Sequence, residues 1–132
     1  MKASQWIRTG ALFGLLAIVF GAFGAHALKA HLTPYQLDIW NKAVLYQMIH
    51  ALAICFIGLL ILFTTENILN NAGWLFTAGI ICFSGSLYIL ATADLMGINA
   101  KWAGPVTPLG GICFIGGWIL LSLTKVKSKK EN

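Results

Sequence analysis

The chain has 132 residues, of which 58% are hydrophobic and only 10% are charged. A soluble domain of this length keeps much of its surface in water, so this composition excludes an ordinary soluble protein and predicts lipid as the main solvent. The formal net charge of +5 comes from short basic flanks. Nucleic-acid binding needs a folded basic face with aromatic or polar side chains that contact the bases. Short basic flanks do not provide such a face, so we expect no nucleic-acid partner.

Four apolar runs are each long enough to cross a bilayer as a helix. A hydrocarbon core of about 30 Å needs about 20 helical residues. The runs cover residues 9–28, 43–63, 72–93 and 105–124, and none contains Lys, Arg, Asp or Glu. They are continuous, unlike the short alternating segments of a β-barrel. We therefore predict an all-α membrane protein with four transmembrane helices in one compact bundle.

The first run carries small residues along one side, within an arc of about 80° at 100° per residue. In lipid, small residues that let backbones approach closely promote helix association. A shorter seam of this kind, which includes Cys113, lies in the fourth run. The two helix-packing seams comprise Gly10, Gly14, Ala17, Gly21 and Gly24 in the first run, and Gly110 and Gly117 in the fourth. We expect packing within the chain, with an intersubunit seam as the alternative, and enough surface remains for a homo-oligomer.

The start of the chain also has features of a cleaved secretory signal. Lys2 and Arg8 precede an apolar stretch that ends in Ala25, His26 and Ala27, which fits the small-residue pattern of a cleavage site. Cleavage would leave three spans. The apolar run is longer than the hydrophobic part of a usual signal and keeps its glycine seam, so we favour a retained first span.

Basic residues predict the orientation, because cytoplasmic flanks hold Lys and Arg in excess. An even number of spans places both termini on one side, together with Lys2, Arg8 and the lysines of the tail at 125–132. The other side holds Lys29, Lys42 and Lys101. We expect both termini in the cytoplasm and anionic lipid headgroups as partners of the basic tail.

The second helix is predicted to begin before its apolar run. Thr33 is a helix cap, Pro34 suits the first helical position, and Gln36 completes a capping box. Trp40 follows on a face that fits the headgroup region. The segment before the second span is therefore expected to be an interfacial helical lead-in.

Polar side chains gather toward one end of the four runs. Polar groups within a span are costly against lipid and usually face the bundle, a partner or a watery cavity. The candidate polar cluster comprises His26, Tyr46, Gln47, His50, Ser84, Ser86, Tyr88 and Thr107. All four runs contribute, toward the outer half in the assigned orientation. On a straight helix His26 lies about 160° from the glycine seam, so either the helix unwinds near Gly24 or its two faces meet different neighbours.

Interhelical hydrogen bonds are the simplest role for these groups, for example between His50 and Tyr88 or between Gln47 and Ser84. The alternatives are a proton relay, a metal or a haem at His26 and His50, since histidine titrates near neutral pH. A structural zinc site needs four ligands, whereas the cysteines sit deeper and lack CxxC spacing. We expect no metal, no cofactor and no enzymatic activity, because the sequence shows no nucleophile elbow, phosphate loop or carboxylate pair. The cysteines are Cys55, Cys82 and Cys113.

Four separated stretches are similar to a known family. They read GAFGAHAL at 21–28, YQMIHALA at 46–53, FSGSLY at 83–88 and TPLGG at 107–111. The chain thereby resembles, over about residues 10–122, the YgdD-like family of small bacterial integral membrane proteins, a domain of unknown function with TMEM-type eukaryotic relatives. The resemblance implies a four-helix protein of the bacterial plasma (inner) membrane. It implies no established substrate, reaction or cofactor.

Two functional hypotheses follow. We favour a structural or interaction protein, in which the polar cluster fixes helix register and oligomer state. The alternative is a small transporter or channel component for a proton or small polar solute, with the Gly-Pro-rich start of the fourth run opening a vestibule. The nearly apolar inner half opposes a continuous path through one subunit.

Overall fold

The computed structural model describes residues 1–64 and 67–125, and this part of the chain is helical without a strand. The elements in order are α1 (Ala3–His26), the 3-10 turn η1 (Leu28–Ala30), α2 (Pro34–Leu60), α3 (Asn67–Gly79), the π-helical segment η2 (Ile80–Ser84), α4 (Gly85–Met96) and α5 (Ala103–Ser122). Together α3, η2 and α4 form one continuous span, so four helical spans are long and apolar enough to cross a membrane. The predicted all-α architecture with four transmembrane helices is confirmed.

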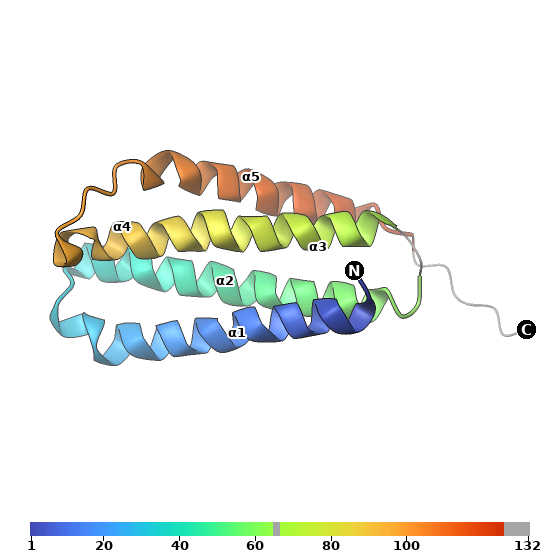
Figure 1. Cartoon of the computed structure of the whole chain (residues 1–132), viewed down its shortest axis with the longest axis horizontal. Coiled ribbons are helices and arrows are strands. Elements are labelled where there is room, and N and C mark those ends of the chain that lie inside the picture. Colours follow the sequence, from blue (N-terminus) through green and yellow to red (C-terminus); the bar gives the residue numbers. More distant parts are fainter. Residues whose placement is uncertain (65–66, 126–132) are drawn as a thin grey trace, which may run out of the picture.

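The four spans run up and down beside one another (Figure 1). One end of the molecule holds the connection from α1 to α2 and the loop from α4 to α5, and we call it the turn end. The opposite end holds the start of α1, the connection from α2 to α3 and the end of α5, and we call it the terminal end. Of the basic tail at 125–132, only Lys125 is among the described residues.

The second helix begins at Pro34, well before the apolar run at 43–63, as its capping residues predict. Thr33 Oγ1 accepts from the Gln36 backbone N–H at 3.2 Å, and the Thr33 N–H donates to Gln36 Oε1 at 2.9 Å. This reciprocal pair satisfies backbone donors at the helix start. Gln36 Nε2 also donates to Asp94 Oδ2 at 2.7 Å, which ties the start of α2 to the end of α4.

The glycine seam of α1 lies against α2. A Cβ atom built on Gly10 would stand 2.5 Å from Cys55 Sγ and 2.6 Å from the Ala51 carbonyl oxygen. One built on Gly24 would stand 2.5 Å from Trp40 Nε1. Ala17 is fully buried, whereas Gly14 and Gly21 have looser surroundings. The seam therefore brings two backbones of the same chain together, as small residues do in membranes.

The seam of α5 packs in the same way against the third span. A Cβ on Gly110 would collide with the backbone of Phe83, and one on Gly117 would stand 2.5 Å from the ring of Phe76. Larger residues at either position would push α5 away from α3 and η2. Both seams thus serve packing within the chain.

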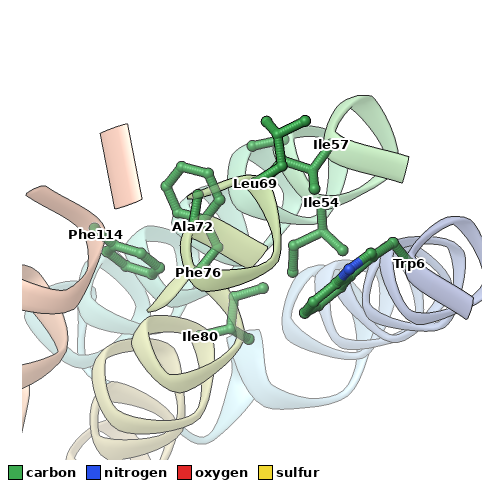
Figure 2. Packing of buried hydrophobic residues seen from close by; sticks show 9 residues of the cluster. Trp6, Ile54, Ile57, Leu69, Ala72, Phe76, Ile80 and Phe114 are labelled. Carbon is green, nitrogen blue, oxygen red and sulfur yellow. The ribbon is translucent and has the colours of Figure 1, made fainter. Parts of the chain in front are cut away.

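An apolar core fills the half of the bundle toward the terminal end. Figure 2 shows how its side chains pack. Its members come from all four spans, and Trp6, Ile54, Ile57, Leu69 and Phe76 are fully buried. The indole of Trp6 lies between α1 and α3, where its N–H donates to Asn70 Oδ1 at 2.8 Å. The buried aromatic ring contributes packing area, while its polar nitrogen reaches a partner near the helix end.

Candidate functional site

The side chain of Gln47 joins three spans near the middle of the bundle. It is 3% exposed, on the face of α2 that also carries the buried residues Ala43 and Ala51. Its Nε2 donates to the carbonyl oxygen of Phe13 in α1 at 2.9 Å, and its Oε1 accepts from the Tyr88 hydroxyl of α4 at 2.9 Å. The amide therefore has both a donor and an acceptor partner, which lowers the cost of burying it.

The side chain of His50 connects α2 to α5. Its Nδ1 lies 2.7 Å from the carbonyl oxygen of Tyr46, one turn earlier, and its Nε2 lies 3.1 Å from Nε1 of Trp118. A carbonyl oxygen only accepts and an indole N–H only donates. Nδ1 must therefore carry the proton and Nε2 the lone pair, so both contacts require one neutral tautomer. The imidazole also stacks on Phe114, with ring centroids 3.5 Å apart and planes at 8°.

Two serines complete the connections between spans. Ser84, fully buried at the end of η2, donates from Oγ to the carbonyl oxygen of Ala43 in α2 at 2.8 Å. Ser86 Oγ shares a hydrogen bond of 2.7 Å with Thr107 Oγ1, which links α4 to α5. We call the side chains of Gln47, His50, Ser84, Ser86, Tyr88, Thr107 and Trp118 the interhelical polar network.

The π-helical segment η2 lies within this network. A π-helix places one extra residue in a turn and commonly marks a functional or structural irregularity in a span. Here it runs over Ile80–Ser84 and ends on the serine that bonds to α2. Gly110 of α5 packs directly against Phe83 at the same level. The irregular turn therefore lies where the third span contacts α2 and α5 together.

Two predicted members of the polar cluster lie outside the network. His26 is exposed at the end of α1, which stays helical as far as His26. The helix does not unwind at Gly24, so its two faces meet different surroundings, with the glycine seam on α2 and His26 turned away. Tyr46 is 40% exposed and contributes its ring, which lies 4.6 Å from that of Phe83, and its backbone carbonyl.

The pairings expected from the sequence are wrong in detail. Tyr88 bonds to Gln47 and not to His50, and Ser84 bonds to a backbone carbonyl and not to Gln47. His50 reaches Trp118 in the last turns of α5, so the network extends past the middle of the bundle toward the terminal end.

Trp118 is the network member that the sequence interpretation missed. A signal for it was present, because an indole N–H in an apolar environment needs an acceptor. The other two interhelical indole bonds obey the same rule, since Trp6 donates to Asn70 and Trp40 donates to the carbonyl oxygen of Phe20 at 2.9 Å. The backbone acceptors in α1 and α2 carry no sequence signal.

A groove of about 210 Å³ opens beside the network, between α1 and the third span. Phe13, Leu16 and Phe20 line it from α1, and Ile81 lines it from η2. Gln47 and Tyr88, which also line it, are hydrogen-bonded to each other. The groove therefore presents mostly apolar surface to whatever occupies it.

No three His, Cys, Asp or Glu side chains within residues 1–64 and 67–125 are arranged to hold a metal ion. The three cysteines are free thiols in separate positions. Cys55 Sγ donates to the carbonyl oxygen of Ile7 at 3.7 Å, across the contact between α1 and α2. That contact gives Cys55 a packing role beside Gly10.

Four apolar spans joined through buried hydrogen bonds define a polytopic α-helical membrane protein. Residues 20–111 match the family model described as "Protein of unknown function (DUF423)", and the chain belongs to this family. The predicted membership of a family of small bacterial membrane proteins of unknown function is confirmed.

Its relatives cover nearly the whole chain. A UPF0382 membrane protein of Staphylococcus aureus (strain bovine RF122 / ET3-1) is 46% identical over 122 residues, which span 92% of this chain and 95% of the relative. A UPF0382 membrane protein of Staphylococcus haemolyticus is 42% identical over the same shares. UPF0382 membrane protein YwdK of Bacillus subtilis is 40% identical over 123 residues, or 92% of this chain and 96% of the relative. No solved structure matches the chain.

Proposed function

We propose that the protein is a non-catalytic structural or interaction protein of the bacterial plasma membrane, and that the interhelical polar network sets how its four helices fit together. One observation carries the proposal. Within the described residues, every buried side-chain nitrogen and oxygen has a hydrogen-bond partner. The network partners connect α1 to α2, α2 to α4 and α5, and α4 to α5. Groups so fully paired suit a fixed arrangement of helices better than exchange with a passing solute.

The energetic argument rests on register as much as on strength. An interhelical side-chain hydrogen bond in a membrane contributes about 0.6 to 2 kcal/mol. A shift of α1 along α2 would separate Gln47 from the Phe13 carbonyl. It would also replace Gly10 by a larger residue opposite Cys55, where even a Cβ atom would stand only 2.5 Å from Sγ. The amide left without a partner would cost more than the bond itself contributes. Few other helix arrangements can both pair the Gln47 amide and keep Gly10 opposite Cys55, so the network favours a single arrangement of the four helices.

Thermal unfolding of the full chain in detergent tests this proposal with Gln47→Ala and His50→Ala. We expect both variants to unfold at a lower temperature than the parent protein. Asn41→Ala is the matched control, because Asn41 is an exposed polar residue of the same helix. If both network variants unfold at the same temperature as the parent protein and the control, the network does not hold the bundle.

Self-association stays a prediction. Leu109, Ile112 and Ile115 on α5 are 59%, 64% and 62% exposed and face lipid or a second copy. Native mass spectrometry of the protein released from nanodiscs measures the oligomer directly. We expect a defined homo-oligomer in the parent protein and a larger monomer fraction in His50→Ala; a monomer under all conditions would refute self-association.

We further propose that both termini lie in the cytoplasm and that the basic tail binds anionic headgroups. Lys2 and Arg8 lie at the terminal end and support this orientation, together with the lysines at 127, 129 and 130, which lie outside the described residues. With the free thiols Cys55, Cys82 and Cys113 replaced by Ala, Ser4→Cys and Lys29→Cys each allow a test with a membrane-impermeant thiol reagent on intact cells. We expect labelling at position 29 and not at position 4. The reverse pattern would show that both termini lie outside the cytoplasm.

The transport alternative has less support. The groove beside Gln47 is mostly apolar, and the two polar side chains that line it bond to each other. Proton or solute flux through liposomes that contain the purified protein would favour transport. We expect no flux above that of empty liposomes.

A further inference from the structure

A second surface pocket lies at the turn end, where α4 passes into the loop before α5. Its volume is about 380 Å³, and its lining combines charged, amide and apolar side chains from the last turns of α4 and from the loop. Asp94, Asn99 and Lys101 supply the polar part, and Leu90 and Ile98 supply apolar surface. This mixture differs from the mostly apolar lining of the groove beside Gln47.

The two charges of this pocket have opposite signs and are not paired with each other. Within residues 1–64 and 67–125, the one side-chain ion pair joins Lys42 to Asp38, at 2.7 Å. Asp94 Oδ2 accepts from the neutral amide of Gln36, which orients the carboxylate without neutralising it. The Asn99 side-chain oxygen accepts from the Lys101 backbone N–H at 3.1 Å, and its amide NH₂ group remains free to donate.

The helix ends reinforce this separation of charge. Asp94 lies in the last turn of α4, and Lys101 lies two residues before the first residue of α5, Ala103. The C-terminus of a helix carries partial negative charge and the N-terminus partial positive charge. Within the pocket lining, Asp94 therefore favours a cation and Lys101 favours an anion, as a zwitterionic ligand requires.

The pocket lies where the third span ends, at the level expected for lipid headgroups. The third span ends at Met96, followed by Gly97 in the left-handed conformation with φ of 64°. Trp102 and Tyr35, at the same end of the bundle, are 60% and 75% exposed. Exposed Trp and Tyr at span ends are typical of the boundary between hydrocarbon and water.

We propose that this pocket binds the headgroup of phosphatidylethanolamine, with the ammonium group at Asp94 and the phosphate at Lys101 and Asn99. Leu90 and Ile98 then contact the glycerol and the upper part of the acyl chains. A primary ammonium donates hydrogen bonds to a carboxylate, which a quaternary choline headgroup cannot do. The headgroup of phosphatidylglycerol offers no cation to Asp94. This site is separate from the interhelical polar network and goes beyond the function proposed above.

Retention of bound lipid by the full-length protein tests this proposal. The purified chain is incubated with equal amounts of phosphatidylethanolamine, phosphatidylcholine and phosphatidylglycerol, and bound lipids are counted by native mass spectrometry. We expect the pocket to retain phosphatidylethanolamine in preference to phosphatidylcholine, while the basic tail also holds phosphatidylglycerol. Asp94→Asn and Lys101→Gln should each weaken its retention by roughly two- to fivefold, the range of an exposed charge pair. Asp38→Asn and Lys29→Gln remove matched charges near the same end, outside the pocket, and should leave retention unchanged.

A second measurement distinguishes a lipid headgroup from the free headgroup in solution. Soluble phosphoethanolamine lacks the acyl chains, so we expect it to leave the unfolding temperature unchanged at a concentration where the lipid raises it. An equal rise with soluble phosphoethanolamine would overturn the assignment to a lipid. Equal retention of phosphatidylethanolamine and phosphatidylcholine by the parent protein, or unchanged retention of phosphatidylethanolamine in both Asp94→Asn and Lys101→Gln, would overturn the proposal.

Discussion

The indole N–H of Trp118 donates to Nε2 of His50 at 3.1 Å and thereby joins α5 to α2. The two helices also meet through the stacked rings of His50 and Phe114. Since Nδ1 of His50 is held by the Tyr46 carbonyl, the imidazole is oriented by a contact on each nitrogen. The pair places one titratable group of the membrane interior in a single orientation.

Removing the indole donor should weaken the contact between α2 and α5. We expect Trp118→Phe to lower the free energy of unfolding by about 1 kcal/mol, because Nε2 of His50 loses its partner while much of the aromatic packing on Phe76 is kept. Unfolding in mixed micelles measures the change. Trp74→Phe is the control, since Trp74 is 56% exposed; an equal loss in both variants would show that the hydrogen bond contributes nothing.

The tautomer of His50 is a separate prediction. Both of its contacts require the proton on Nδ1, so nitrogen NMR of the labelled protein in detergent at neutral pH should show one fixed Nδ1-protonated form. The exposed His26 and His31 supply comparison signals in the same spectrum. Observation of the Nε2-protonated form at His50 would contradict the Trp118 contact.

The bond between Gln47 and Tyr88 should appear as a coupling energy. A double-mutant cycle with Gln47→Leu and Tyr88→Phe removes the amide and the hydroxyl separately and together, and we expect a coupling of about 0.6 to 2 kcal/mol. Unfolding free energies of the four proteins supply the cycle. Additive effects would mean that the 2.9 Å contact is not formed in the membrane protein.

The seam between α1 and α2 should reject even one methyl group where the backbones are closest. A Cβ at Gly10 would stand 2.6 Å from the Ala51 carbonyl oxygen, so we expect Gly10→Ala to cost about 1 to 3 kcal/mol by overpacking. The unfolding free energy in mixed micelles measures this cost.

Gly85→Ala is the matched control for the seam. A Cβ there meets nothing within 4 Å, and the substitution at this helical position should be neutral or stabilising by about 0.4 to 1 kcal/mol. If Gly10→Ala is as stable as Gly85→Ala, the two helices do not approach as closely as described.

Much of the fold could be predicted because its signals are local. The four spans follow from uninterrupted apolar length, the start of α2 follows from Thr33, Pro34 and Gln36, and the seam of α1 follows from small residues at helical spacing. The candidate site was predicted less completely. The sequence identifies six of its polar side chains as groups that must face inward, but it does not identify their hydrogen-bond partners. These side chains are Gln47, His50, Ser84, Ser86, Tyr88 and Thr107.

Only the tertiary structure decided those partners, and the reason is geometric. A hydrogen bond depends on tenths of an ångström and on the rotation of each helix, and the acceptors of Gln47 and Ser84 include backbone carbonyls of Phe13 and Ala43 that every residue type possesses. The π-helical turn over Ile80–Ser84 changes the rotation of the residues that follow it. The sequence by itself determined that polar groups must be paired inside a lipid-facing bundle, because unpaired ones are too costly there; the three-dimensional packing determined which atoms pair and left His26 outside.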